Sequence, residues 1–85
     1  MKIKSVYLER KGYTINEFRN LIIQDIKSRG IYGLTTRVTP YKLKLIYNGD
    51  SLMIPYRTLE RGTIKEVVDF YEEDIKDLFK NKEGD

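Results

Sequence analysis

The feature that most constrains the fold is a pair of apolar-alternating segments joined by Asn48-Gly49. Both central residues of a type I′ turn need positive φ, which Asn and Gly tolerate. A loop centred on Gly49-Asp50 would shift the pairing by two residues but keep the same faces. The pattern therefore predicts an antiparallel hairpin with one apolar face. With Asn48-Gly49 as the loop, the pairs on that face are Leu45–Leu52, Leu43–Ile54 and Tyr41–Tyr56.

A further strand is expected before the hairpin. Residues 34–39 alternate, with Arg37 on the polar side, and Pro40 breaks the pattern. Antiparallel pairing with residues 41–47 would need a tight turn around Thr39-Pro40. Proline cannot donate to a ladder, so Pro55 marks an edge strand or a strand end. The second face of the hairpin carries Lys42, Lys44, Ile46, Ser51, Met53 and Pro55.

Two segments have helical periodicity. Thr14 and Glu17 fit a capping box, and Gly30 is a natural helix stop. Thr63 and Glu66 repeat the capping box before a second, longer helix. The first apolar stripe is Ile15, Phe18, Leu21, Ile22 and Ile26; the second is Ile64, Val67, Val68, Tyr71, Ile75, Leu78 and Phe79.

The two ends of the chain complete the predicted architecture. Residues 1–10 read as a strand that ends in a Lys11-Gly12 turn, although alternation breaks at residues 5–7. Residues 81–85 are polar and predict a frayed tail. We therefore expect one domain, 1–85, of the α+β class. Its order is β-α-β-β-β-α, with an antiparallel sheet of three or four strands and two helices packed on one face.

Composition excludes several chemistries. The sequence contains no cysteine and no histidine, which removes disulfides, thiolate metal sites and the usual general base. No apolar run approaches the roughly 20 residues of a membrane span. We expect no enzyme activity, no cofactor, no metal and no membrane association. Lack of cysteine is typical of a reducing compartment, so we expect a cytoplasmic location.

Four short motifs within residues 15–70 form a recognisable set: Ser28-Arg29-Gly30-Ile31, Asn48-Gly49, Ile54-Pro55 and Leu59-Glu60-Arg61-Gly62-Thr63-Ile64. With these motifs, this part of the chain resembles the HicA family of toxin ribonucleases. The resemblance implies a double-stranded-RNA-binding-like α-β-β-β-α fold. The family's catalytic histidine would lie at Tyr41 or Lys42, so the resemblance implies a relative that does not cleave RNA.

The charge distribution is asymmetric. Residues 1–61 carry 12 Lys and Arg against 5 Asp and Glu, a net charge of +7, whereas residues 62–85 have a net charge of −4. A basic body favours polyanions through counterion release. The alternative is a solvated face on which lysines prevent edge-to-edge aggregation. The predicted nucleic-acid-binding residues are Arg37, Lys42 and Lys44 on the outer sheet face, with Arg57 and Arg61 at its edge.

Aromatic residues supply the candidate partner contacts. Tyr47 or Tyr56 would add aromatic contacts to nucleic acid. Phe70 lies beside the helical stripe, which predicts either a partner surface, including a homodimer, or a broad buried face. Asp69 and Glu73, one turn apart, are able to share a divalent metal, but a solvated acidic face is the simpler expectation. Tyr47 and Phe70 are therefore the predicted partner contacts.

These observations predict a small non-catalytic protein that binds RNA or DNA through a basic sheet face. The alternative is a protein-binding regulator or inhibitor of mobile-element or phage type that acts on a host protein. Small size, abundant tyrosine and a surface of both charges motivate this alternative.

Overall fold

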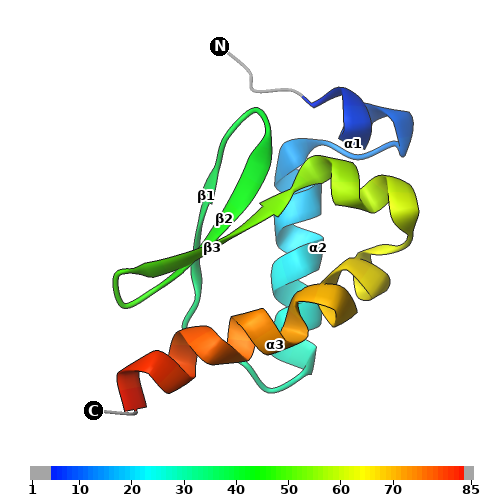
Figure 1. Cartoon of the computed structure of the whole chain (residues 1–85). Helices are drawn as coiled ribbons and strands as arrows, with labels where there is room; N and C mark the ends of the chain where they lie inside the picture. Colours follow the sequence, from blue (N-terminus) through cyan, green and yellow to red (C-terminus); the bar gives the residue numbers. More distant parts are fainter. Residues whose placement is uncertain (1–4, 84–85) are drawn as a thin grey trace.

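The computed structural model describes residues 5–83, with side chains described for residues 5–79. A three-stranded antiparallel sheet packs with helices, which confirms the predicted α+β class (Figure 1). The elements in chain order are α1 (Val6–Arg10), α2 (Ile15–Ser28), β1 (Thr35–Val38), β2 (Lys42–Tyr47), β3 (Asp50–Pro55), the 3₁₀ helix η1 (Tyr56–Arg61) and α3 (Ile64–Glu83).

The sheet has the order β1-β2-β3, so β2 is central. The β2–β3 turn has φ of 51° at Asn48 and 93° at Gly49, as a type I′ turn requires. Leu45 pairs with Leu52 and Leu43 with Ile54, which confirms the predicted register. The predicted pairing of β1 with β2 is also confirmed.

The core lies between one face of the sheet and the two long helices. Leu43, Leu45 and Ile54 are fully buried from the sheet side. They belong to one hydrophobic cluster with the stripes of α2 and α3. Figure 1 shows α2 (cyan) beside the sheet and α3 (orange to red) packed near its end. Both helices therefore cover the same face, and the opposite face carries no helix from the described part of the chain.

Local capping chemistry sets the helix ends as predicted. The Glu17 N–H donates to Thr14 Oγ1 at 3.1 Å, and the Thr14 N–H donates to Glu17 Oε1 at 2.9 Å. Thr63 and Glu66 make the same reciprocal pair at 3.2 and 3.0 Å. Helix α2 ends at Ser28 and is capped by Arg29, and φ is 84° at the following residue, Gly30. Such positive φ strains any residue with a Cβ, which explains the glycine.

Tyr56 links the core to the β1–β2 turn. Its ring is fully buried and meets Phe18 edge-on, with centroids 5.4 Å apart. Its hydroxyl donates to the Thr39 carbonyl at 2.7 Å. The Thr39 hydroxyl in turn accepts the Lys42 N–H at 3.0 Å and so closes the turn. Tyr41 does not share this burial: it is 79% exposed, so its predicted place on the apolar face is wrong.

The predicted N-terminal strand is wrong for residues 6–10, which form α1; residues 1–4 lie outside the described part of the chain. The Gly12 N–H donates to the Glu9 carbonyl, and the Tyr13 N–H donates to the Leu8 carbonyl. These bonds form a Schellman motif, so Gly12 ends a helix rather than turning a strand. Leu8 is fully buried, and α1 packs against η1.

The chain end also differs from the prediction. Helix α3 continues to Glu83, so residues 81–83 are helical rather than a frayed tail, and residues 84–85 lie outside the described range. The connector after β3 is the 3₁₀ helix η1, which buries Tyr56 and Leu59.

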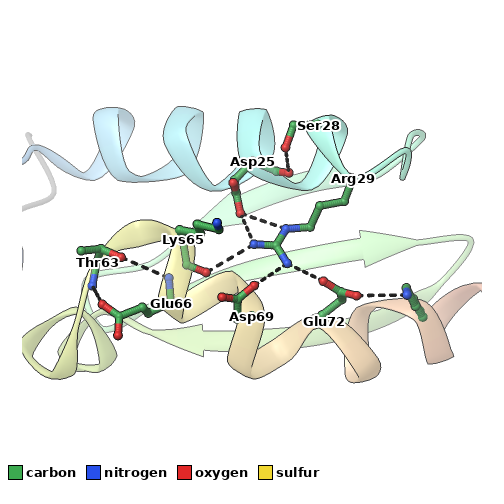
Figure 2. Close-up of polar contacts among 9 residues, drawn as sticks. Asp25, Ser28, Arg29, Thr63, Lys65, Glu66, Asp69 and Glu72 are labelled. Carbon is green, nitrogen blue, oxygen red and sulfur yellow. Dashed lines mark hydrogen bonds and ion pairs between the residues drawn. The ribbon is translucent and has the colours of Figure 1, made fainter.

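Arg29 joins α2 to α3 (Figure 2). Its side chain is only 17% exposed. Its Nε and Nη2 donate to Asp25 Oδ2 at 3.1 and 2.9 Å. Its Nη1 lies 2.6 Å from Asp69 Oδ1 and also pairs with Glu72. One guanidinium therefore bridges a carboxylate of α2 and two carboxylates of α3.

The neighbouring carboxylates keep the Arg29 guanidinium protonated. Burial lowers the pKa of Arg29, but the hydrogen bonds that it donates to Asp69, Glu72 and Asp25 outweigh this effect, so the net pKa is raised and the guanidinium stays charged. The Lys76 ammonium, 3.0 Å from Glu72, is the largest cause that lowers the pKa of Glu72, followed by Arg29.

Replacing Arg29 with lysine is expected to lower the free energy of unfolding by about 2 kcal/mol. An ammonium is a point charge and cannot reproduce the planar fork that reaches both helices. Urea unfolding followed by circular dichroism measures the change. The matched control is Lys27→Arg on the exposed side of α2, which should stay within about 0.5 kcal/mol of the parent protein. Equal effects of the two variants would contradict the bridging role of Arg29.

Stability is expected to fall in acid because the folded-state pKa of Glu72 lies below its ordinary value of 4.5. Such a group stabilises the fold above pH 4.5, and this contribution disappears as pH falls through the lowered pKa. Urea unfolding from pH 6 to pH 3 should show a shallower pH dependence in Glu72→Gln. Identical pH dependence in the two proteins would contradict this assignment.

Tyr56→Phe is expected to lower the free energy of unfolding by about 1 kcal/mol, because it removes the hydrogen bond to the Thr39 carbonyl while keeping the ring. The control Tyr41→Phe removes a hydroxyl from an exposed side chain and should be nearly neutral. Thermal unfolding of both variants provides the comparison, and an equally stable Tyr56→Phe would show that the hydrogen bond contributes nothing.

Candidate nucleic-acid interface

Three of the predicted nucleic-acid-binding residues lie together on the helix-free face of the sheet. Arg37 in β1 is the direct cross-strand partner of Lys44 in β2. Lys42 follows two residues away on β2, on the same face, and pairs with Pro55 of β3. We call Arg37, Lys42 and Lys44 the basic sheet patch. Because neighbouring strands lie about 4.8 Å apart and alternate residues about 6.6 Å apart, the three side chains form a compact group.

The basic sheet patch places like charges side by side. Cations directly opposite each other on neighbouring strands destabilise a sheet. Within the described part of the chain, none of these three side chains forms an ion pair that would offset the repulsion. Arg37 is exposed, while Lys42 and Lys44 are half-buried along their stems. The arrangement is suited to an external anion.

The other strand residues on this face are a mixture of small polar and apolar side chains. Lys44 also pairs with Met53 of β3, which is exposed. Thr35, Ile46 and Ser51 form the next cross-strand row. Among the described strand residues on this face none is aromatic, so bases have no ring to stack on in the centre of the sheet.

The predicted set of five cations divides into two groups. Arg57 and Arg61 lie on η1, after the end of β3, rather than on the sheet. Both act electrostatically on Tyr71 of α3. Arg61 also lines a surface groove with Phe70, so the structure brings together one predicted nucleic-acid contact and one predicted partner contact.

The two predicted aromatic contacts to nucleic acid have intramolecular roles. The Tyr47 ring packs on Phe79 of α3, with centroids 4.0 Å apart, on the core side of the sheet. Tyr56 is fully buried, so its predicted contact with nucleic acid is wrong. Phe70, in contrast, is 76% exposed. Of the two predictions made for Phe70, the structure therefore supports a surface position and rules out burial.

Within the described residues, the acidic side chains of α3 are not grouped as a metal site requires. Asp69, which sequence pairs with Glu73, already contacts Arg29. Within residues 5–79, no group of three or more potential ligands is placed to hold a metal ion. In the sequence, the only sign of a metal site in this region is the i,i+4 spacing of Asp69 and Glu73. The observed ion pair of Asp69 is instead with Arg29, which lies 40 residues earlier in the chain. Nothing in local spacing indicates such a contact.

No helix in the described part of the chain is long and apolar enough to cross a membrane. The basic sheet patch offers three cations to an anion, and the lack of histidine and cysteine in the sequence removes Ser-His and Cys-His nucleophile pairs. Comparison of this chain with protein-family models, with curated proteins and with solved structures found no match.

Proposed function

We propose that this protein binds nucleic acid without cleaving it, through the basic sheet patch of Arg37, Lys42 and Lys44. The carrying observation is the cross-strand pairing of Arg37 with Lys44, two cations held side by side with no ion pair in the described chain. Phosphates would relieve their repulsion and release counterions. Both long helices pack on the other face, so a strand of nucleic acid meets no steric obstacle from them.

The chemistry of the face indicates how nucleic acid would be recognised. Lysine and arginine contacts to phosphate position a nucleic acid but carry no sequence information. The strand residues of the open face offer no stacking platform, so base identity contributes little. We therefore propose sequence-independent binding, in the micromolar range or weaker at physiological salt.

Catalysis is not part of this proposal. In the resemblance to HicA, which stays a prediction, the position of the catalytic histidine falls on Tyr41 and Lys42. Tyr41 is an exposed side chain at the β1–β2 turn. The Lys42 side chain is positively charged and donates hydrogen bonds, and both properties favour binding to phosphate. The neighbouring cations Arg37 and Lys44 extend that role rather than supply a base.

The double variant Arg37→Ala/Lys44→Ala is expected to weaken binding to a fluorescein-labelled 20-nucleotide RNA by about tenfold. Each lost phosphate contact should also reduce the slope of log affinity against log salt by about 0.7. Fluorescence anisotropy at 50 and 150 mM KCl measures both quantities. A 20-base-pair DNA duplex and an RNA duplex of the same length serve as further probes.

The matched control is Lys11→Ala/Lys27→Ala, which removes the same charge from exposed positions outside the sheet. This control should retain most of the affinity and the full salt slope. An affinity that does not change with salt concentration, or an equal loss of affinity in both double variants, would overturn the assignment of the basic sheet patch. Gel analysis of the incubated RNA should show intact strands, and cleavage by the purified protein would contradict the non-catalytic role.

A further inference from the structure

A groove lies between η1 and α3, away from the basic sheet patch. Its volume is about 170 Å³. Val67 in its lining is nearly fully buried, and Tyr71 is half-buried. Phe70 also lines the groove, and its ring meets Tyr71 edge-on with centroids 5.0 Å apart. The groove is therefore an apolar hollow next to an exposed aromatic side chain.

The two sides of the groove have opposite charge. Arg61 of η1 and Glu66 of α3 line the groove. Arg57 on η1 and Asp74 on α3 lie outside the lining, with Asp74 one turn beyond Phe70 and Tyr71 along the helix. Burial raises the pKa of Tyr71, Asp74 raises it further, and the two arginines oppose the rise. All three charges thus act on the same hydroxyl. Within the described chain neither Arg57 nor Arg61 forms an ion pair, and neither does Asp74.

The size of the groove limits what it can hold. A volume of about 170 Å³ is below the range of cofactor and drug-sized pockets, but close to that of a cavity that holds benzene. It therefore fits one aromatic or branched aliphatic side chain. An exposed aromatic residue at the rim of such a hollow is typical of a protein contact surface.

We propose that this groove binds a protein segment that presents one large apolar side chain between an acidic and a basic residue. The apolar side chain fills the hollow against Val67 and packs on Phe70. The acidic residue pairs with Arg61 on η1, and the basic residue pairs with Glu66 on α3, which are the two charged side chains that line the groove. Charge complementarity on both sides fixes the direction of the segment.

A nucleic acid fits this surface less well than a peptide. Residues 62–85, which include α3, have a net charge of −4. Glu73 and Asp74 are exposed one turn from Phe70 and would repel a phosphate. A segment with both charges satisfies both sides of the groove, whereas a polyanion satisfies only the arginines of η1.

Selection of random 12-residue peptides displayed on phage tests the proposal. The wild-type chain is the bait, and Phe70→Ala is used for counter-selection. The enriched peptides should share an apolar residue with Asp or Glu on one side and Lys or Arg on the other. Fluorescence anisotropy with the synthesised consensus peptide should show affinity at least about tenfold weaker for Phe70→Ala. Because Phe70 is exposed, this variant should keep its melting temperature within about 3 °C.

Charge reversal tests the direction of the segment. Arg61→Glu should weaken the consensus peptide by about tenfold, and a peptide with its acidic residue replaced by lysine should recover that loss. Met53→Ala, an exposed apolar residue on the sheet, is the matched control and should leave peptide affinity within about twofold.

Several results would overturn the proposal. These are a selection without a consensus, a consensus peptide that binds Phe70→Ala equally well, and a loss at Arg61→Glu that the charge-reversed peptide does not recover. Sedimentation that shows a dimer of the wild type and a monomer of Phe70→Ala would instead assign the groove to a second copy of the chain. RNA affinity that falls with Phe70→Ala, while no peptide is enriched, would assign it to nucleic acid.

Discussion

The ion cluster around Arg29 fixes how the two long helices meet. A chain of this length buries a thin core, so a polar contact between helices matters more than in a larger domain. The guanidinium joins Asp25 near the end of α2 to Asp69 and Glu72 on α3, and Arg29 itself is the residue that follows the last residue of α2. With this end held, the apolar stripes of both helices lie over Leu43, Leu45 and Ile54. The cluster and the apolar stripe of α3 therefore agree on which side of the helix faces inward.

The same constraint determines which surfaces stay open. Because both helices pack on one face of the sheet, the basic sheet patch faces outward. Because Asp69 and Glu72 of α3 contact Arg29, Phe70, which lies next to Asp69 in the sequence, is left on an exposed side of α3. Two surfaces of different chemistry result from one packing arrangement. One consists of cations on a sheet, and the other is an aromatic groove with charges of both signs.

Features set by neighbouring residues were predictable from the sequence. Asn48-Gly49 predicts the turn and, with it, the register of β2 and β3, and the Thr–Glu pairs predict where α2 and α3 begin. The N-terminal strand was wrong because Gly12 can follow either a strand or a helix, and five residues are too few for a helical period to show. The role of Arg29 depends on contacts between residues more than 30 positions apart. The groove beside Phe70 depends on how η1 packs against α3. Neither feature leaves a periodic pattern in the sequence from which it could be predicted.

Charge also distinguishes the two surfaces that we propose as binding sites. The net charge of +7 on residues 1–61 would by itself attract a polyanion to many parts of the body, including Arg57 and Arg61. Glu66 of α3 lines the same groove as Arg61, and Asp74 and the two arginines have opposing effects on the pKa of Tyr71. The negative charge of α3 therefore weakens the attraction between phosphate and the arginines of η1. It weakens the attraction between phosphate and the basic sheet patch less, because Coulomb interactions fall with distance and are screened within about 10 Å. A nucleic acid should accordingly favour the basic sheet patch, which leaves the groove beside Phe70 available to a ligand that carries both charges.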